Sequence, residues 1–318
     1  MKLRHILDHA LMLQDQTRMR AYLKAIRSTC EAKTVCEVGV GFGPLSLMAL
    51  RAGAAKVYGI EHDAETLALA TEVIRANGFD ASRFVPIKGL STKVDLPERV
   101  DVVLSETLDS MGIGESTLPF LSDAARRFLK PGGVMIPSRL ECEVALASPA
   151  AYRARRDLWA SSLGADYGLR YDVVAERVRS HKHTIPVAPD EVMSDWQRWQ
   201  GLDLANPSTF LPVSPALFVP EREGEALGLA FAFDVTLAGD VHLRTRPEDP
   251  QTHWFQGFHA FPKPLTLAFG EAVYAELVTS PESFDDIRFE MHVASGPGAE
   301  ISRLVRERLA VLVGGAAG

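Results

Sequence analysis

The sequence of 318 residues has little of several features that mark whole classes of protein. It contains only three cysteines, Cys30, Cys36 and Cys142, and their odd number and lack of metal-ligand spacing argue against a disulfide framework or a zinc site. It has no apolar run near the ~20 residues that cross a membrane, and its first residues lack the apolar core of a signal peptide. We therefore expect reduced thiols, no metal, no membrane association and a cytoplasmic location.

The sequence also has no large excess of charge of either sign. Lys and Arg number 34 against 41 Asp and Glu, and the formal net charge is -7. No basic block marks a phosphate-binding face, so nucleic acid is not an expected partner. Hydrophobic residues at 47% and charged residues at 24% are typical of a folded, soluble protein, and the length favours two domains.

The first half of the chain alternates short apolar strands with helical patterns. An opening helical region is predicted for Ile6–Ile26. The elements that follow are strands Thr34–Val38, Lys56–Glu61, Phe84–Lys88 and Val100–Ser105 and helices Leu45–Ala52, Ala64–Ala76 and Pro119–Leu129. This alternation predicts a doubly wound α/β fold with a parallel sheet. Ligands bind such sheets at the carboxyl ends of the strands, where Gly39, Glu61 and Glu106 fall.

The pattern changes after about Pro137. Alternating segments separated by turn residues predict antiparallel strands at Leu227–Leu237, Trp254–Phe261, Leu265–Leu277 and Ile287–Val293. Helices are predicted for Tyr152–Trp159 and Glu300–Val313, whereas the stretch through Trp196 and Trp199 has no clear period. The second half is therefore expected to be mostly β.

A cofactor site is predicted at the first strand and turn. Three glycines, Gly39, Gly41 and Gly43, alternate after the acidic Glu37. This spacing suits S-adenosylmethionine (SAM) better than the G-x-G-x-x-G of dinucleotide folds. Glu61, at the end of the next strand, can accept both ribose hydroxyls. A structural loop with a solvated carboxylate, or a nicotinamide-dependent dehydrogenase, would share parts of this pattern.

The loop Glu106–Glu115 begins and ends with a carboxylate. Here the chain resembles the protein arginine methyltransferase family, in which two glutamates at this separation hold the substrate guanidinium. The resemblance implies that Glu106 and Glu115 do so here. It also implies a SAM-binding domain over residues 1–137 and a β-barrel-like domain over residues 138–318. The second domain would carry a helical arm at about residues 155–190 that forms a homodimer.

Other motifs extend the resemblance to roughly residues 9–254. The segment His9–Arg18 resembles the first helix of the family and implies that Arg18 binds the SAM carboxylate, Asp15 supports the active site and Met12 borders the substrate nitrogens. The segment Thr252-His253-Trp254 resembles the Thr-His-Trp loop, whose histidine pairs with that aspartate, and Trp254 is predicted to bind the substrate. Taken singly, Arg18 is better explained as a solvated charge, His253 as a structural histidine and Trp254 as a core residue. The ordered set of motifs favours the functional interpretation.

Departures from the family pattern concern the acceptor side. Thr107 stands where tryptophan is common, Asp109 replaces a usual glycine, and only eight residues precede His9, so we expect the aromatic lid helix to be absent or replaced. These differences favour free L-arginine, or a related guanidino metabolite, over arginine in a protein. A silent SAM-binding protein is a further alternative, which the intact glutamate pair disfavours.

The predicted chemistry follows from the acceptor. A guanidinium has a pKa above ~12 and arrives protonated and poorly nucleophilic. Two carboxylates can fix its plane, draw charge from the attacking nitrogen and offset its repulsion from the sulfonium. Glu115 is the predicted proton acceptor, with Asp15 and His253 as a relay.

Overall fold

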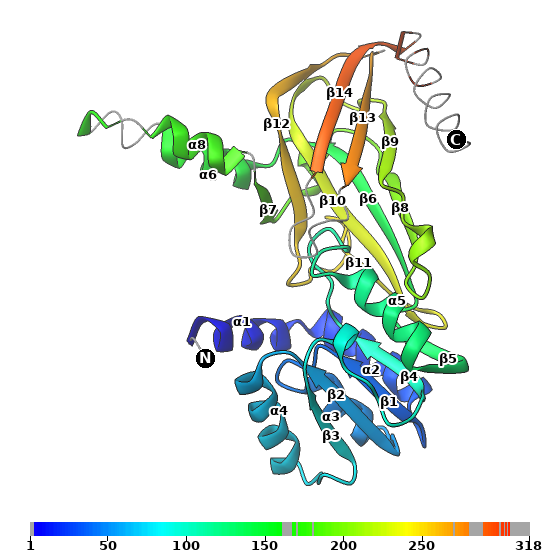
Figure 1. Ribbon diagram of the computed structural model, residues 1–318. Coiled ribbons are helices and arrows are strands. Elements are labelled where there is room, and N and C mark those ends of the chain that lie inside the picture. Colours follow the sequence, from blue (N-terminus) through cyan, green and yellow to red (C-terminus); the bar gives the residue numbers. More distant parts are fainter. Residues whose placement is uncertain are drawn as a thin grey trace.

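The computed structural model describes residues 3–160, 167–169, 171–179, 181–269, 271–279, 289–298 and residues 300, 301, 303 and 305. Its first half is a five-stranded parallel sheet in the order β3-β2-β1-β4-β5, at the bottom of Figure 1. The strands are β1 (Thr34–Val38), β2 (Lys56–Glu61), β3 (Phe84–Lys88), β4 (Val100–Ser105) and β5 (Leu129–Ile136). The helices are α1 (Leu3–Gln14), α2 (Gln16–Thr29), α3 (Pro44–Arg51), α4 (Ala64–Ala76) and α5 (Thr117–Phe128), with a 3-10 turn η1 (Ser91–Lys93).

The central strands of this sheet are apolar because both faces are covered. Four of the five residues of β1 and five of the six of β2 are buried. Such strands lose the alternation of a half-exposed strand and read as continuous apolar runs. The strand order reverses between β1 and β4, so the carboxyl ends of these two strands flank the switch point where ligands bind in open α/β sheets.

The opening helical region is two helices rather than one. Asp15 separates α1 from α2 and is the N-cap of α2, since its side chain accepts a hydrogen bond from the Arg18 amide at 2.9 Å. A capping aspartate satisfies an amide that has no partner within the helix. Tyr22 and Ile26 of α2 are fully buried. The Tyr22 hydroxyl donates to the carbonyl of Ser105, the last residue of β4, at 3.1 Å, which ties α2 to the carboxyl end of the sheet.

The second half is antiparallel. A six-stranded sheet has the order β7-β12-β10-β6-β8 with β11 on β10, and a three-stranded sheet has the order β14-β13-β9. The strands are β6 (Arg139–Ala147), β7 (Lys182–Ile185), β8 (Gln197–Asp203), β9 (Val213–Phe218), β10 (Gly224–Ala238), β11 (Val241–Arg244), β12 (Gln256–Leu267), β13 (Glu271–Thr279) and β14 (Phe289–Pro297). Two 3-10 turns, η2 (Pro189–Glu191) and η3 (Pro207–Thr209), connect them. The predicted α/β fold followed by a mostly β half is confirmed.

Two details of the second half differ from the sequence prediction. Leu265–Leu277 is not one strand: β12 ends at Leu267, and β13 begins at Glu271 in the other antiparallel sheet. Two alternating segments on either side of a short turn show the same period, so alternation alone does not reveal the turn. The stretch without a clear period contains β8, in which the adjacent Trp199 and Gln200 are both buried.

Two helices project from the antiparallel half. Helices α6 (Ala150–Ala160) and α8 (Asp172–Arg179) extend to the left in Figure 1, away from the sheets. Within the predicted arm at about residues 155–190, Lys182–Ile185 forms strand β7. Most of the predicted terminal helix Glu300–Val313 lies outside the described residues. Among the helices that the structure describes, none is long and apolar enough to cross a membrane.

Candidate functional site

The glycine turn between β1 and α3 depends on backbone angles that other residues rarely adopt. Gly39, Gly41 and Gly43 have φ of 77°, 55° and 83°. A Cβ on Gly41 would lie 2.9 Å from the His9 ring, which stacks on Phe42 with ring centroids 4.2 Å apart. The alternate glycines therefore keep the backbone open to a close approach, and α1 covers the turn from one side.

Glu61 ends β2 next to this turn and is only 7% exposed. One carboxylate oxygen accepts a hydrogen bond from the Gly41 amide at 3.1 Å, and the other accepts from the Asp63 amide at 3.0 Å. The two bonds hold the carboxylate flat against the turn, where a ribose would present its hydroxyls. This placement fits the role predicted for Glu61.

Glu37 lies beneath the turn rather than at its surface. It is 1% exposed, and its carboxylate accepts a hydrogen bond from the Ser46 hydroxyl of α3. Burial raises the pKa of Glu37 to about 8, with the nearby Glu61 and Glu106 adding to the rise and the Ser46 bonds opposing it. Glu37 lines the pocket, but its hydrogen bond with Ser46 joins strand β1 to helix α3.

Arg18 and Glu106 form an ion pair that the sequence did not predict. Arg18 of α2 is 5% exposed, and one end nitrogen of its guanidinium contacts a Glu106 carboxylate oxygen. The other donates to the backbone carbonyl of Met12 at 2.7 Å. Its Nε is buried and has no hydrogen-bond partner among the described residues. The guanidinium therefore joins the predicted cofactor side of the pocket to the first carboxylate of the acceptor loop.

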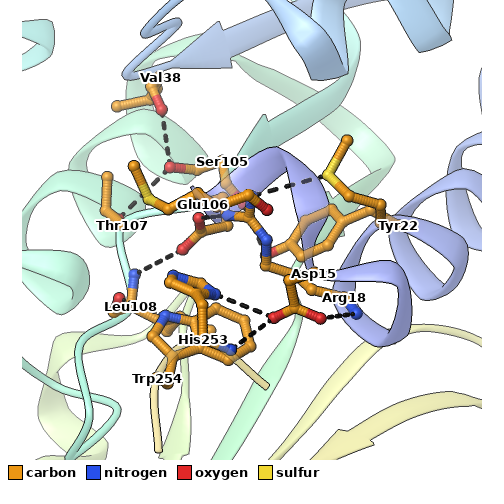
Figure 2. Close-up of polar contacts among 12 residues, drawn as sticks. Asp15, Arg18, Tyr22, Val38, Ser105, Glu106, Thr107, Leu108, His253 and Trp254 are labelled. Atoms are coloured by element: carbon orange, nitrogen blue, oxygen red, sulfur yellow. Dashed lines mark hydrogen bonds and ion pairs between the residues drawn. The ribbon is translucent and has the colours of Figure 1, made fainter. Parts of the chain in front are cut away.

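Asp15 and His253 meet as the resemblance predicted. The Asp15 carboxylate accepts from the His253 amide at 2.8 Å and lies 3.0 Å from its ring Nδ1. Figure 2 shows this carboxylate between His253 and the first turn of α2. Burial raises the pKa of Asp15, but the hydrogen bonds from His253 and Arg18 outweigh burial, and the net pKa is lowered. Asp15 is thus held as a carboxylate that orients His253.

The loop between Glu106 and Glu115 is held by contacts from the antiparallel half. The Trp254 indole donates to the Leu108 carbonyl at 2.9 Å, and the Gly257 amide donates to the Ser110 carbonyl at 3.1 Å. Trp254 is 4% exposed, so its bond to the loop is shielded from water. Trp254 therefore holds the backbone of the acceptor loop in place. Its direct contact with the substrate stays a prediction.

Glu115 occupies a strained position at the end of this loop. Its φ is 55°, in the left-handed region that residues with a side chain seldom adopt. Glu115 is exposed and lines the pocket. Desolvation, the largest cause, and the charges of Glu106 and Asp109 together raise the pKa of Glu115 to about 7, against the opposing charge of Lys182. A carboxyl group with this pKa can hold or release a proton near neutral pH.

All twelve predicted site residues are in or beside one pocket of ≈ 1710 Å³. Eleven line it, including Met12, and the twelfth, Gly43, caps α3 directly after the lining residue Phe42. Since a drug-sized ligand occupies a pocket of roughly 300–1,000 Å³, this one has room for two. The glycine turn, the Glu61 carboxylate and the spare Arg18 donor fit SAM. Within the described residues, no group of His, Cys, Asp and Glu is arranged to hold a metal ion.

The polar residues on the far wall of the pocket were not predicted from the sequence. Lys182 and Thr184 of β7 line it, and they contact Asp109 and Ser110 of the acceptor loop. Asp109 was identified only as a departure from the family pattern. The local signal for β7 was the alternation Lys182–Ile185, but alternation does not say which distant loop the polar face contacts.

Comparison with protein families divides the chain in the same way as its sheets. Residues 35–133 match the model of a methyltransferase domain, and residues 143–296 match that of the arginine methyltransferase oligomerization subdomain. The chain is 30% identical over 294 residues to protein arginine N-methyltransferase 6 of Xenopus tropicalis, which covers 87% of this chain and 84% of that protein. It is also 30% identical over 277 residues to the arginine N(omega)-methyltransferase of Streptomyces achromogenes, which covers 85% of this chain and 75% of that protein.

Solved structures share the fold. The Trypanosoma brucei PRMT1 enzyme-prozyme heterotetrameric complex with AdoHcy matches 90% of this chain and 97% of that one, with a TM-score of 0.76 at 22% identity. Arabidopsis thaliana protein arginine methyltransferase 10 matches 92% and 97%, with a TM-score of 0.75 at 24% identity. With its two family domains and its relatives at 30% identity, the chain belongs to the protein arginine methyltransferase family, whose cofactor is SAM.

Proposed function

We propose that this protein transfers a methyl group from SAM to the guanidinium of free L-arginine or a related guanidino metabolite. The observation that carries the proposal is that two carboxylates, Glu106 and Glu115, line the same pocket as the glycine turn and Glu61. SAM, when bound, supplies an electrophilic methyl group on a sulfonium. The rest of the chemistry is the work of the protein, which must hold and polarise a poor nucleophile.

The two glutamates can do so because a guanidinium presents its N–H groups in one plane. Carboxylates on two sides accept charge-assisted hydrogen bonds, fix that plane and concentrate positive charge on the nitrogens they contact. The third nitrogen keeps more of its lone pair. The same negative charges offset the repulsion between the guanidinium and the sulfonium. A neutral pair of side chains would give orientation without this electrostatic effect.

The remaining residues orient the glutamates. Arg18 contacts Glu106, and Trp254 fixes the loop backbone at Leu108. After methyl transfer a proton must leave the substituted nitrogen, and Glu115, with its pKa raised to about 7, is the proposed acceptor. Asp15 and His253, hydrogen-bonded at the edge of the same pocket, are the proposed relay to solvent.

Two features support a free amino acid as acceptor. The acceptor loop carries Thr107 and Asp109 where the family commonly has tryptophan and glycine. A relative that covers 85% of the chain bears the name arginine N(omega)-methyltransferase, without the word protein. The second candidate is arginine in a protein, which is favoured by the names of other relatives, such as the probable protein arginine N-methyltransferase 6.1 of Oryza sativa.

A mass-spectrometric assay distinguishes free arginine from arginine in a protein as the acceptor. The purified protein is incubated with SAM and either free L-arginine or an arginine-rich peptide, under identical conditions. We expect methylated free arginine, because the proposed acceptor is the free amino acid. Methylation of the peptide alone would refute this proposal and support protein modification. No methylation of either acceptor would favour a protein that binds SAM without turnover.

The chain is further proposed to form a homodimer through α6 and α8. Residues 143–296 match the oligomerization subdomain, and no described residue of α8 is buried. Apolar side chains on and between the two helices are exposed, with Leu158 at 62%, Tyr167 at 71%, Leu169 at 48% and Val173 at 77%. Such a grouping is typical of a surface that a partner covers.

Light scattering at micromolar concentration tests the dimer. We expect the mass of two chains for the unaltered protein and of one chain for Val173→Asp, because a buried unpaired carboxylate opposes association. The matched control is Val219→Asp, at a residue that is 63% exposed outside the arm and should leave the dimer intact. A monomeric mass for the unaltered protein would contradict the proposal.

A further inference from the structure

The far wall of the pocket carries a charged pair that the methyl-transfer chemistry does not use. Strand β7 pairs antiparallel with β12, and its residues alternate between two sides. His183 and Ile185 are buried on one side. Lys182 and Thr184 are exposed and line the pocket. The period of the strand therefore presents one ammonium and one hydroxyl together to the acceptor loop.

Asp109 fixes the position of that ammonium. One oxygen of its carboxylate accepts hydrogen bonds from the amides of Met111 at 3.0 Å and Gly114 at 2.9 Å. The other oxygen contacts the Lys182 ammonium. Since Gly114 precedes Glu115, the ammonium is held beside the end of the loop that carries the second carboxylate. The Asp109 side chain is 11% exposed and that of Lys182 is 38% exposed, so the lysine is the member of the pair that is open to the pocket.

An ammonium has three N–H donors, and Asp109 is the acceptor that Lys182 contacts among the described residues. The other permanent cation that lines the pocket, within the described part of the chain, is Arg18. Arg18 is already engaged by Glu106 and the Met12 carbonyl, and its remaining buried Nε is the donor that fits SAM. Lys182 is therefore the cation available to an anion on the acceptor side.

Free arginine brings such an anion, whereas an arginine within a peptide does not. Its guanidinium would lie between Glu106 and Glu115, and its carboxylate is at the other end of the same side chain. We propose that Lys182 binds the α-carboxylate of the free amino acid and thereby selects it over acceptors that lack this group. The Thr184 hydroxyl, 3.0 Å from that of Ser110, is the neighbouring donor on the same strand face. This inference rests on the proposed function.

Agmatine, which is arginine without its carboxylate, provides the test. In steady-state assays with saturating SAM, the unaltered protein should have a lower KM for L-arginine than for agmatine. Lys182→Met should raise the KM for L-arginine roughly 10- to 100-fold, the usual effect of losing a hydrogen bond to a charged group, and leave that for agmatine nearly unchanged. Lys182→Arg should restore most of the preference, because it keeps the positive charge.

The matched control is Lys130→Met. Lys130 pairs with Asp101 at 2.9 Å and its side chain is 42% exposed, but it lies outside the pocket. The Lys130→Met variant should change neither the KM for L-arginine nor the KM for agmatine. Equal losses with both acceptors in Lys182→Met would overturn the inference, since Lys182 would then only position the loop. Equal KM values for both acceptors in the unaltered protein would also overturn it, while leaving methylation of free guanidino compounds intact. Methylation of peptide alone would refute the proposed function itself.

Discussion

Replacing Glu115 with glutamine is expected to lower kcat roughly 10²- to 10⁴-fold, the usual contribution of a positioned acid or base, while the Kd for SAM changes little. Glutamine keeps the shape and one acceptor oxygen but cannot take the proton. It also removes one negative charge from the guanidinium clamp. The effect should fall on turnover because Glu115 lies at the acceptor end of the pocket, whereas the residues that fit SAM lie around the glycine turn.

The pH dependence of activity in the unaltered protein provides a second test of Glu115 as the proton acceptor. With a pKa raised to about 7 by desolvation and by Glu106 and Asp109, the carboxylate form is lost as pH falls through 7. The value of kcat/KM for the acceptor should therefore fall below neutral pH, and a bound sulfonium would move this limb somewhat lower by favouring the carboxylate. Glu115→Gln should lack the limb. Near-normal turnover in that variant would exclude Glu115 as the proton acceptor.

Replacing Glu61 with glutamine should have the opposite signature. We expect the Kd for SAM, measured by calorimetry, to rise roughly 10- to 100-fold, in keeping with the loss of hydrogen bonds to a charged group. The two oxygens of Glu61 accept separately from the Gly41 and Asp63 amides. An amide side chain has one oxygen, so it would leave one of these donors facing an N–H group and would accept less well from the ribose.

At saturating SAM, the kcat of Glu61→Gln should stay close to that of the unaltered protein, because Glu61 does not touch the acceptor loop. Glu98→Gln is the control: Glu98 is on the surface, where it accepts from the Tyr58 hydroxyl at 2.8 Å, and it does not line the pocket. An unchanged Kd in Glu61→Gln would show that this carboxylate does not bind the ribose. The two variants together separate cofactor binding from proton transfer.

Much of the fold could be predicted because its signals are local. The bounds of β1 to β4 and of α4 agree with the apolar runs and the turn residues that flank them. The positive φ of the three glycines is a property that only glycine adopts freely, so the turn is recorded in the sequence itself. The pairing of Asp15 with His253, 238 positions apart, came instead from the family resemblance.

Other contacts of the site had no local signal. The ion pairs of Arg18 with Glu106 and of Lys182 with Asp109 join residues 88 and 73 positions apart. Charged residues at such separations have no period or spacing that links them. The same holds for the Trp254 indole and the Leu108 carbonyl, because any backbone carbonyl is an acceptor and only packing selects one.

Residue order alone predicts the alternating α/β half, the β-rich second half and the glycine turn, and the family resemblance adds the role of the two carboxylates in the acceptor loop. These follow from residue periodicity, glycine conformation and short motifs, which act over a few neighbouring positions. The contact that β7 makes through Lys182 with Asp109 arises only in the folded chain, as does the pKa of Glu115, which desolvation and neighbouring charges raise to about 7. The electrostatic environment of a group depends on which distant segments of the chain pack around it, and these segments come together only when the two halves of the protein fold against each other.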